Sequence, residues 1–183
     1  MVPYRILRSS RRTLALQILP DGGVVVRCPR RLPEEDIRAF VESKEGWLRK
    51  HLAQLPEPQP RLTKQELQAM AQLARTDLLL RLDTFALRLG VTFQKVTVQA
   101  QRTRWGSCSS KGTISLNCLL MLAPPQVRDY VAVHELCHLL EMNHSPAFWR
   151  LVASVLPDFS QSRQWLEEQG PALMSRLPVT PSE

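Results

Sequence analysis

The chain has 183 residues, of which 44% are hydrophobic and 22% charged, a composition typical of a soluble globular protein. No apolar run approaches the roughly 18 residues that a membrane helix needs, and the N-terminal segment lacks the apolar core of a secretory signal. Length and composition therefore predict a single compact unit in the cytoplasm and exclude an integral membrane protein.

The net charge of +7 is concentrated near the start of the chain, where residues 1–31 carry seven arginines and one acidic residue, Asp21. Such clustering can indicate contact with nucleic acid or another polyanion. Solvated arginines on the exposed face of a strand are the simpler interpretation, because no aromatic residues that could stack on bases are interleaved with them. A nucleic-acid partner for this basic region stays open as an alternative.

The first predicted elements are a β-hairpin and a helix. Apolar residues alternate over 13–18 and return over 24–26, and the turn sequence Pro20-Asp21-Gly22-Gly23 separates the two runs. Beyond Pro33, apolar residues recur at helical spacing and acidic residues occupy the first turn, which predicts one helix over residues 33–54.

Residues 55–62, with the sequence LPEPQPRL, are the best candidate for a linker, because three closely spaced prolines cannot continue a helix. We therefore expect an N-terminal hairpin-and-helix lobe over 1–55 and a linker over 56–62. A larger domain would follow over 63–176, and a flexible tail over 177–183.

The larger domain begins with a predicted helix over 64–89. Thr63 and Glu66 form a capping box at its start, and Gly90 suits its C-terminal stop. A strand is expected over 91–99, where a slip in the apolar alternation suggests a bulge. The turn residues 109–112 then predict a second hairpin, with Ile114, Leu116, Cys118 and Leu120 on one face of its second strand.

The next helix carries the motif His134-Glu135-Leu136-Cys137-His138. Residues four apart lie about one turn from each other on the same helix face, so His134 and His138 can grip one ion. Glu135 lies at the edge of that face, where it can reach a water on the metal without binding the metal itself. The motif therefore predicts a catalytic metal site.

A third ligand must come from outside this helix turn to complete a tetrahedron, and His144 meets that need. Ser145 and Pro146 look like the N-cap and first residue of a following helix, so His144 lies in a short corner from which it can fold back. With three neutral imidazoles, Zn²⁺ would keep an open position for a water of lowered pKa, although nickel, cobalt or copper also suit such ligands.

Other residues near the motif have alternative roles. Asp158 could replace His144 as the third ligand, orient a histidine N–H, or simply cap the helix predicted over 159–168. Arg104, Tyr130 and Asn143 are candidates for contacting the substrate oxyanion, and each also has a structural interpretation.

Three segments together resemble the YgjP-like zinc metallopeptidases, relatives of the SprT-like and WLM groups: RWGSCSSKGTISLN at 104–117, DYVAVHELCHLLEMNHSPAFW at 129–149 and LP at 156–157. The resemblance implies a compact α+β, zincin-like fold of the minigluzincin type. It also implies His134, His138 and His144 as zinc ligands and Glu135 as the catalytic acid and base. An extended peptide would then add as a strand beside residues 114–119.

The sequence thus predicts a zinc metallopeptidase acting on peptides or proteins. One alternative is a metal-dependent hydrolase of nucleoside triphosphates, for which the excess of arginine gives some support, although no glycine-rich phosphate loop is present. Another is an SprT-like module whose basic lobe brings the metal site to protein on nucleic acid.

Overall fold

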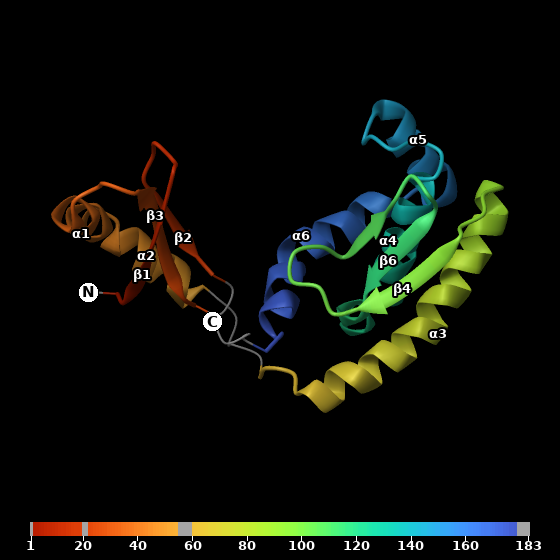
Figure 1. The fold of residues 1–183 in the computed structure, drawn as a ribbon, viewed down its shortest axis with the longest axis horizontal. Coiled ribbons are helices and arrows are strands. Elements are labelled where there is room, and N and C mark those ends of the chain that lie inside the picture. Colours follow the sequence, from red (N-terminus) through yellow and green to blue (C-terminus); the bar gives the residue numbers. More distant parts are fainter. Residues whose placement is uncertain (1, 20–21, 55–59, 179–183) are drawn as a thin grey trace. The chain divides into compact units, whose positions relative to one another are not determined.

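The computed structural model describes residues 2–19, 22–54 and 60–178 and divides into two compact units, Met1–Pro60 and Arg61–Glu183 (Figure 1). Most of the proline-rich stretch predicted as a linker, residues 55–59, lies outside the described residues. Within the part of the chain that is described, no helix combines the length and apolarity needed to cross a membrane.

In the first unit, β1 (Tyr4–Ser9), β2 (Ala15–Ile18) and β3 (Val24–Pro29) form a sheet in the order β1-β3-β2. The predicted hairpin is confirmed by the antiparallel pairing of β2 with β3, although Pro20 and Asp21 of its turn lie outside the described residues. Strand β1, which pairs in parallel with β3, was not predicted. Because β2 lies between the two strands in the sequence, no tight turn joins them and indicates the pairing.

The single helix predicted over 33–54 is wrong: the structure has α1 (Glu34–Ser43) and α2 (Glu45–Ala53), separated at Lys44. The break redirects the chain so that both helices bury apolar residues in one core with β3. Ile37 and Val41 come from α1, and Leu48 comes from α2. The predicted acidic first turn is present at the start of α1.

The second unit opens with α3 (Lys64–Leu89), whose bounds match the prediction. The Thr63 hydroxyl accepts a hydrogen bond from the Glu66 N–H at 3.2 Å, and the Thr63 N–H donates to the Glu66 carboxylate at 2.7 Å. Gly90 ends the helix with a left-handed φ of 66°, which favours glycine.

The sheet of this unit has the order β4-β6-β5, with β4 (Lys95–Gln99), β5 (Gly106–Cys108) and β6 (Thr113–Asn117). The predicted second hairpin is confirmed as β5 and β6. The strand expected over 91–99 begins only at Lys95, and its ladder with β6 is continuous to Gln99. The slip in alternation therefore marks the start of the strand, and the predicted bulge is wrong.

Strand β6, which follows the turn at residues 109–112, is shorter than predicted because the side chain of Asn117 ends the strand. Its Nδ2 donates to the carbonyls of Gln101 and Arg104, and its Oδ1 accepts from the Leu119 N–H at 3.1 Å. A 3-10 helix, η1 (Cys118–Leu122), follows. Cys118 is therefore buried on that helix and does not lie on the strand as expected.

The helices α4 (Pro125–Cys137), α5 (Pro146–Val155) and α6 (Phe159–Ser175) complete the unit. The last helix extends beyond the end predicted at residue 168. Leu177, the first residue of the tail predicted over 177–183, is buried against Leu62 and Leu119. Residues 179–183 lie outside the described residues.

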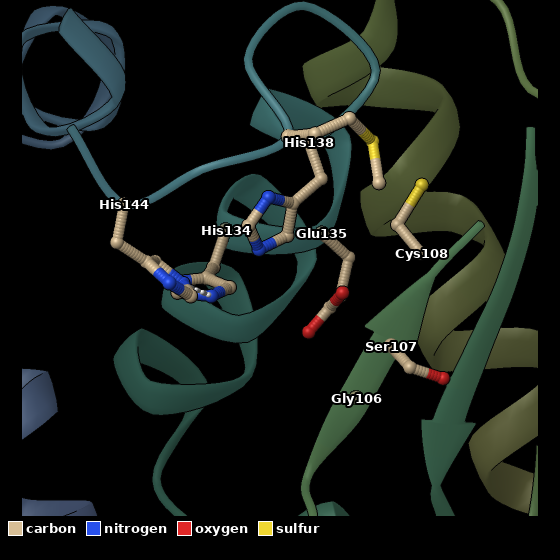
Figure 2. A pocket seen from close by; sticks show the side chains of 8 residues that line it. Gly106, Ser107, Cys108, His134, Glu135, His138 and His144 are labelled. Atoms are coloured by element: carbon tan, nitrogen blue, oxygen red, sulfur yellow. Dashed lines mark hydrogen bonds between the residues drawn. The ribbon is translucent and has the colours of Figure 1, made fainter. Parts of the chain in front are cut away.

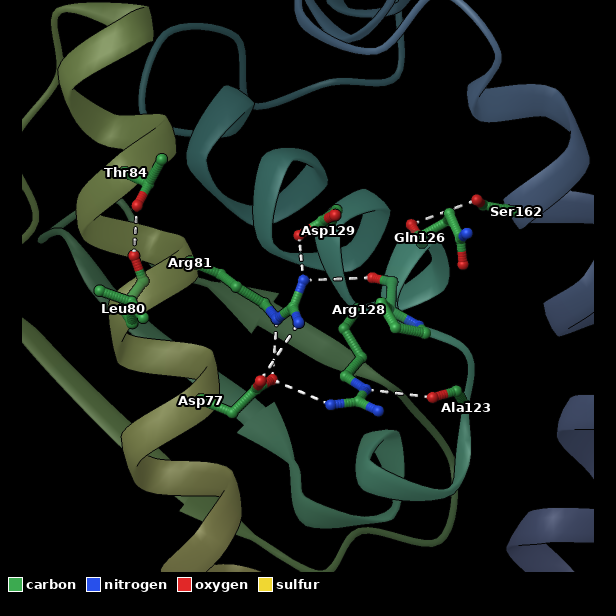
Figure 3. Close-up of polar contacts among 10 residues, drawn as sticks. Asp77, Leu80, Arg81, Thr84, Ala123, Gln126, Arg128, Asp129 and Ser162 are labelled. Atoms are coloured by element: carbon green, nitrogen blue, oxygen red, sulfur yellow. Dashed lines mark hydrogen bonds and ion pairs between the residues drawn. The ribbon is translucent and has the colours of Figure 1, made fainter.

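A cluster of ion pairs fastens α4 to α3 (Figure 3). Arg81 on α3 donates to Asp77 one turn earlier and to Asp129 on α4. Arg128 on α4 pairs with Asp77 at 3.3 Å and donates to the Ala123 carbonyl at 3.0 Å. Because α4 carries the His-Glu-x-x-His motif, these contacts fix the helix that presents the candidate site.

Candidate metal centre

The histidines of the motif converge with the one after it (Figure 2). His134 lies on α4, His138 is the residue that ends α4, and His144 lies in the connection to α5. Ser145 caps α5 by accepting the Phe148 N–H, and Pro146 follows as the first helical residue. One nitrogen from each histidine lies within 4.8 Å of the others, so this corner brings His144 back over α4.

The imidazoles of His134 and His144 face each other with their Nε2 atoms 3.0 Å apart. Two nitrogens bound to one tetrahedral zinc ion, each at about 2.0–2.1 Å, would lie roughly 3.3 Å apart. Burial lowers the pKa of His134 to about 3, helped by the nearby charges of His138, His144 and Arg163. The ring is therefore neutral at pH 7, as a metal ligand must be.

The His138 ring is oriented by a hydrogen bond to the backbone just after α4. Its Nδ1–H donates to the carbonyl of Glu141 at 3.2 Å, which leaves the lone pair on Nε2. A ligating histidine is commonly held by such a hydrogen bond from its other nitrogen. Burial lowers the pKa of His138, so this ring too favours the neutral form.

Glu135 is the buried carboxyl group of the site. The residue is 5% exposed, and its Oε2 has no hydrogen-bond partner among the described residues. Burial raises the pKa of Glu135 to about 8, and the positive charge of Arg104 acts in the opposite direction. An unpaired buried carboxylate oxygen is costly, so this atom is suited to a water or ligand group entering the site.

A cavity of about 290 Å³ joins these groups, and its lining residues come from β5, α4 and the connection to α5: Gly106, Ser107, Cys108, His134, Glu135, His138, Met142 and His144. Of the described strands, β5 pairs only with β6, whereas β6 pairs on both sides. The expectation that a peptide adds beside residues 114–119 is therefore wrong, because most of that segment is the central strand β6. The open edge at the cavity belongs to β5.

Gly106 lies directly against Glu135. A Cβ atom at this position would be only 2.4 Å from Glu135 Oε1, closer than any real contact allows. Residues Gly106, Cys108 and Met142 were not predicted as site residues. A glycine inside a short strand is a signal of close approach by another group, but it does not say which group approaches.

The other residues considered from the sequence are not among the three histidines that could hold a metal and do not line the cavity. Asp158 is exposed at the start of α6 and is not part of the metal-binding group. Arg104 and Asn143 are exposed and do not line the cavity, although the charge of Arg104 acts on Glu135. Tyr130 is buried, with its ring edge against His134.

Residues 12–70 and 58–169 match the YgjP-like metallopeptidase domain. The chain belongs to the YgjP-like metallopeptidase family. The resemblance found from the sequence motifs is thereby confirmed, as is the α+β zincin-like fold class that it implied. Membership in the YgjP-like family makes the chain a metal-dependent peptidase, and proteins or peptides are its class of substrate.

Two solved structures are similar to part of the chain. The metallopeptidase zymogen abylysin of Pyrococcus abyssi is 26% identical, with a TM-score of 0.45, over 50% of this chain and 95% of that chain. The metallopeptidase zymogen jannalysin of Methanocaldococcus jannaschii is 14% identical, with the same TM-score and the same shares covered. The chain matches none of the curated proteins with which it was compared.

Proposed function

We propose that the chain hydrolyses peptide bonds with a zinc ion held by His134, His138 and His144 and with Glu135 as the general base. The observation that carries this proposal is the convergence of three imidazoles on one cavity beside a buried carboxylate oxygen that has no partner among the described residues. The donor set fits zinc, because three nitrogen ligands with one open position are typical of catalytic zinc sites.

When bound, zinc supplies a Lewis acid that makes a water molecule more acidic and polarises the carbonyl group of the substrate. The protein residues perform the remaining steps. Glu135 Oε2 accepts the proton of the attacking water and then delivers it to the leaving amide nitrogen. Burial alone would keep Glu135 protonated near neutral pH, and the charge of a divalent cation held by the three histidines would oppose that effect by favouring the carboxylate.

The backbone of a peptide substrate can bind along the open edge of β5. Gly106, Ser107 and Cys108 line the cavity, and the edge of β5 facing away from β6 is unpaired within the described sheet. An extended peptide can form backbone hydrogen bonds with such an edge, which places a scissile carbonyl near Glu135. No contact among the described residues favours the nucleotide-hydrolase or nucleic-acid alternatives.

The test compares Glu135→Gln with wild type on a library of quenched fluorescent peptides, with zinc content measured for both proteins. We expect Glu135→Gln to keep its zinc and to lose hydrolysis by about 10²- to 10⁴-fold, the usual contribution of general-base catalysis. Glu168→Gln, an exposed carboxylate on α6 that accepts a hydrogen bond from Gln164, is the matched control and should behave as wild type. Undiminished hydrolysis by Glu135→Gln would overturn the proposed mechanism.

A further inference from the structure

His144 differs from the other two histidines in how its ring is held. His138 is oriented by a hydrogen bond to Glu141. The Nδ1 of His134 has no hydrogen-bond partner among the described residues, but that ring is half-buried and projects from a regular helix. His144 is exposed in a connection between helices, and its one polar ring contact within the described chain is through Nε2 to His134. Among the described residues, no hydrogen bond from Nδ1 therefore fixes the plane of the His144 ring. Another contact must orient the ring.

Aromatic rings supply that contact. The His144 ring is nearly parallel to the Trp149 indole, with ring centroids 5.7 Å apart and planes 26° apart. Phe148 meets the His144 ring edge-on, with centroids 4.8 Å apart. Because Trp149 lies one helical turn after the Ser145 cap of α5, the indole is presented by a regular helix rather than by the connection itself.

The indole is itself held by other elements. Phe159 on α6 stacks on Trp149 with the ring planes 13° apart, and the ring of Tyr130 on α4 stacks on Phe159. Tyr130 in turn contacts His134 edge-on. The Arg163 guanidinium lies 5.2 Å from the Trp149 ring, a distance suited to a cation–π interaction. A continuous series of rings thus links His144 to His134 through three helices.

We propose that Trp149 is a positioning residue for the metal centre, whose flat indole holds the His144 ring in its ligating orientation before the metal binds. This inference rests on the proposed role of His144 as a ligand. Trp149 has core spacing in the sequence and is only partly buried, so simple packing is the competing explanation. The two explanations differ in what they require at position 149: a flat ring, or only apolar volume.

The experiment measures the zinc dissociation constant by competition with a chromophoric chelator for wild type, Trp149→Phe and Trp149→Leu. Losing a group that orients a metal ligand typically weakens metal affinity by about 10- to 100-fold. We expect that loss in Trp149→Leu, whereas Trp149→Phe should remain within about threefold of wild type. Trp165→Leu on α6 is the matched control, because Trp165 has no ring contact with a histidine in the described structure. Equal affinities for the phenylalanine and leucine variants would overturn the proposal.

A double-mutant cycle separates ring orientation from general packing. The indole also meets the His134 ring edge-on, with centroids 6.0 Å apart. In the His144→Ala background, Trp149→Leu should therefore weaken the remaining zinc affinity by much less than the roughly 10- to 100-fold expected in the wild-type background, because only the contact with His134 remains. An undiminished effect in that background would contradict the proposal. Wild-type protein that binds no zinc would instead refute the proposed metal centre itself, so the two failures are distinguishable.

If Trp149→Leu does not fold, proton NMR of metal-free wild type and Trp149→Phe still decides the question. A His144 ring held against the indole is shifted upfield by the ring current, and the signal can be assigned by its loss in His144→Ala. We expect that shift in wild type and a smaller one in Trp149→Phe. A His144 signal at the position of a freely rotating histidine would overturn the proposal.

Discussion

Gly106→Ala should reduce catalysis without removing the metal. The added Cβ would lie 2.4 Å from Oε1 of Glu135 and 2.7 Å from its Cγ and Cδ. The backbone of Gly106 does not have a positive φ, so alanine introduces no conformational strain of its own. The clash therefore falls on the Glu135 side chain, while the nitrogens of the three histidines are untouched.

The size of the effect follows from these distances. Ordinary contacts between heavy atoms are about 3.5 Å, so the carboxylate has to move by roughly 1 Å. A misplacement of this size in a catalytic group can lower the rate by about 10²-fold. Removing glycine also restricts the unfolded chain, which adds about 0.4–1 kcal/mol of stability and offsets part of the steric cost. Overpacking a buried site costs about 1–3 kcal/mol, so the free energy of unfolding should fall by no more than about 2.5 kcal/mol.

The assay combines kcat/KM on a responsive peptide, zinc content and urea unfolding. Gly46→Ala is the matched control, because a Cβ at Gly46 on α2 meets no atom within 4 Å. We expect Gly106→Ala to retain zinc and lose about 10²-fold in kcat/KM, and Gly46→Ala to match wild type. The reasoning is refuted if Gly106→Ala keeps full activity, or if it loses zinc together with activity.

Three further predictions concern stability. Since the pKa of Glu135 is raised from 4.5 to about 8, the folded metal-free chain holds a proton that the unfolded chain releases, so the Glu135 contribution to the free energy of unfolding should fall by about 1.5 kcal/mol from pH 6.5 to 8. The lowered pKa values of His134 and His138 act in the opposite direction at the lower end of this range. Glu135→Gln should abolish that fall in urea titrations at the two pH values, and an unchanged slope would disprove it. Asp77→Ala removes the carboxylate that Arg81 and Arg128 share, so that among the described residues Arg81 keeps only Asp129 as a charged partner and Arg128 keeps none. This change should cost about 2 kcal/mol in urea unfolding, against less than about 0.5 kcal/mol for the exposed control Glu167→Ala. Zinc at 100 times its dissociation constant should stabilise the chain by about 2.7 kcal/mol, and a chelator should reverse this; an unfolding midpoint indifferent to both would argue against the metal centre.

Local signals in the sequence predicted the elements that depend on neighbouring residues. The capping box at Thr63, the stop at Gly90 and the cap at Ser145 all appear where expected, because each needs only residues a few positions apart. The convergence of the three histidines also follows from helix geometry and a short corner. These are the parts of the fold and site that sequence reasoning reached.

Contacts between segments that lie far apart in the sequence could not be predicted from local sequence patterns. The break at Lys44 contains no proline or glycine and follows from two helices sharing one core. Asn117 ends β6 by binding carbonyls more than ten residues earlier, which residue type alone does not reveal. The approach of Gly106 to Glu135 and the stacking of Trp149 on His144 likewise depend on how separate elements pack.

The most direct test of the central claim is zinc content per chain, measured by mass spectrometry on wild type, His144→Ala and His51→Ala. His51 is the matched control, since its ring contacts the Trp47 carbonyl and lies outside the metal-binding group. We predict one zinc per chain in wild type and His51→Ala, and loss of zinc in His144→Ala. Full zinc retention by His144→Ala would contradict the proposed centre.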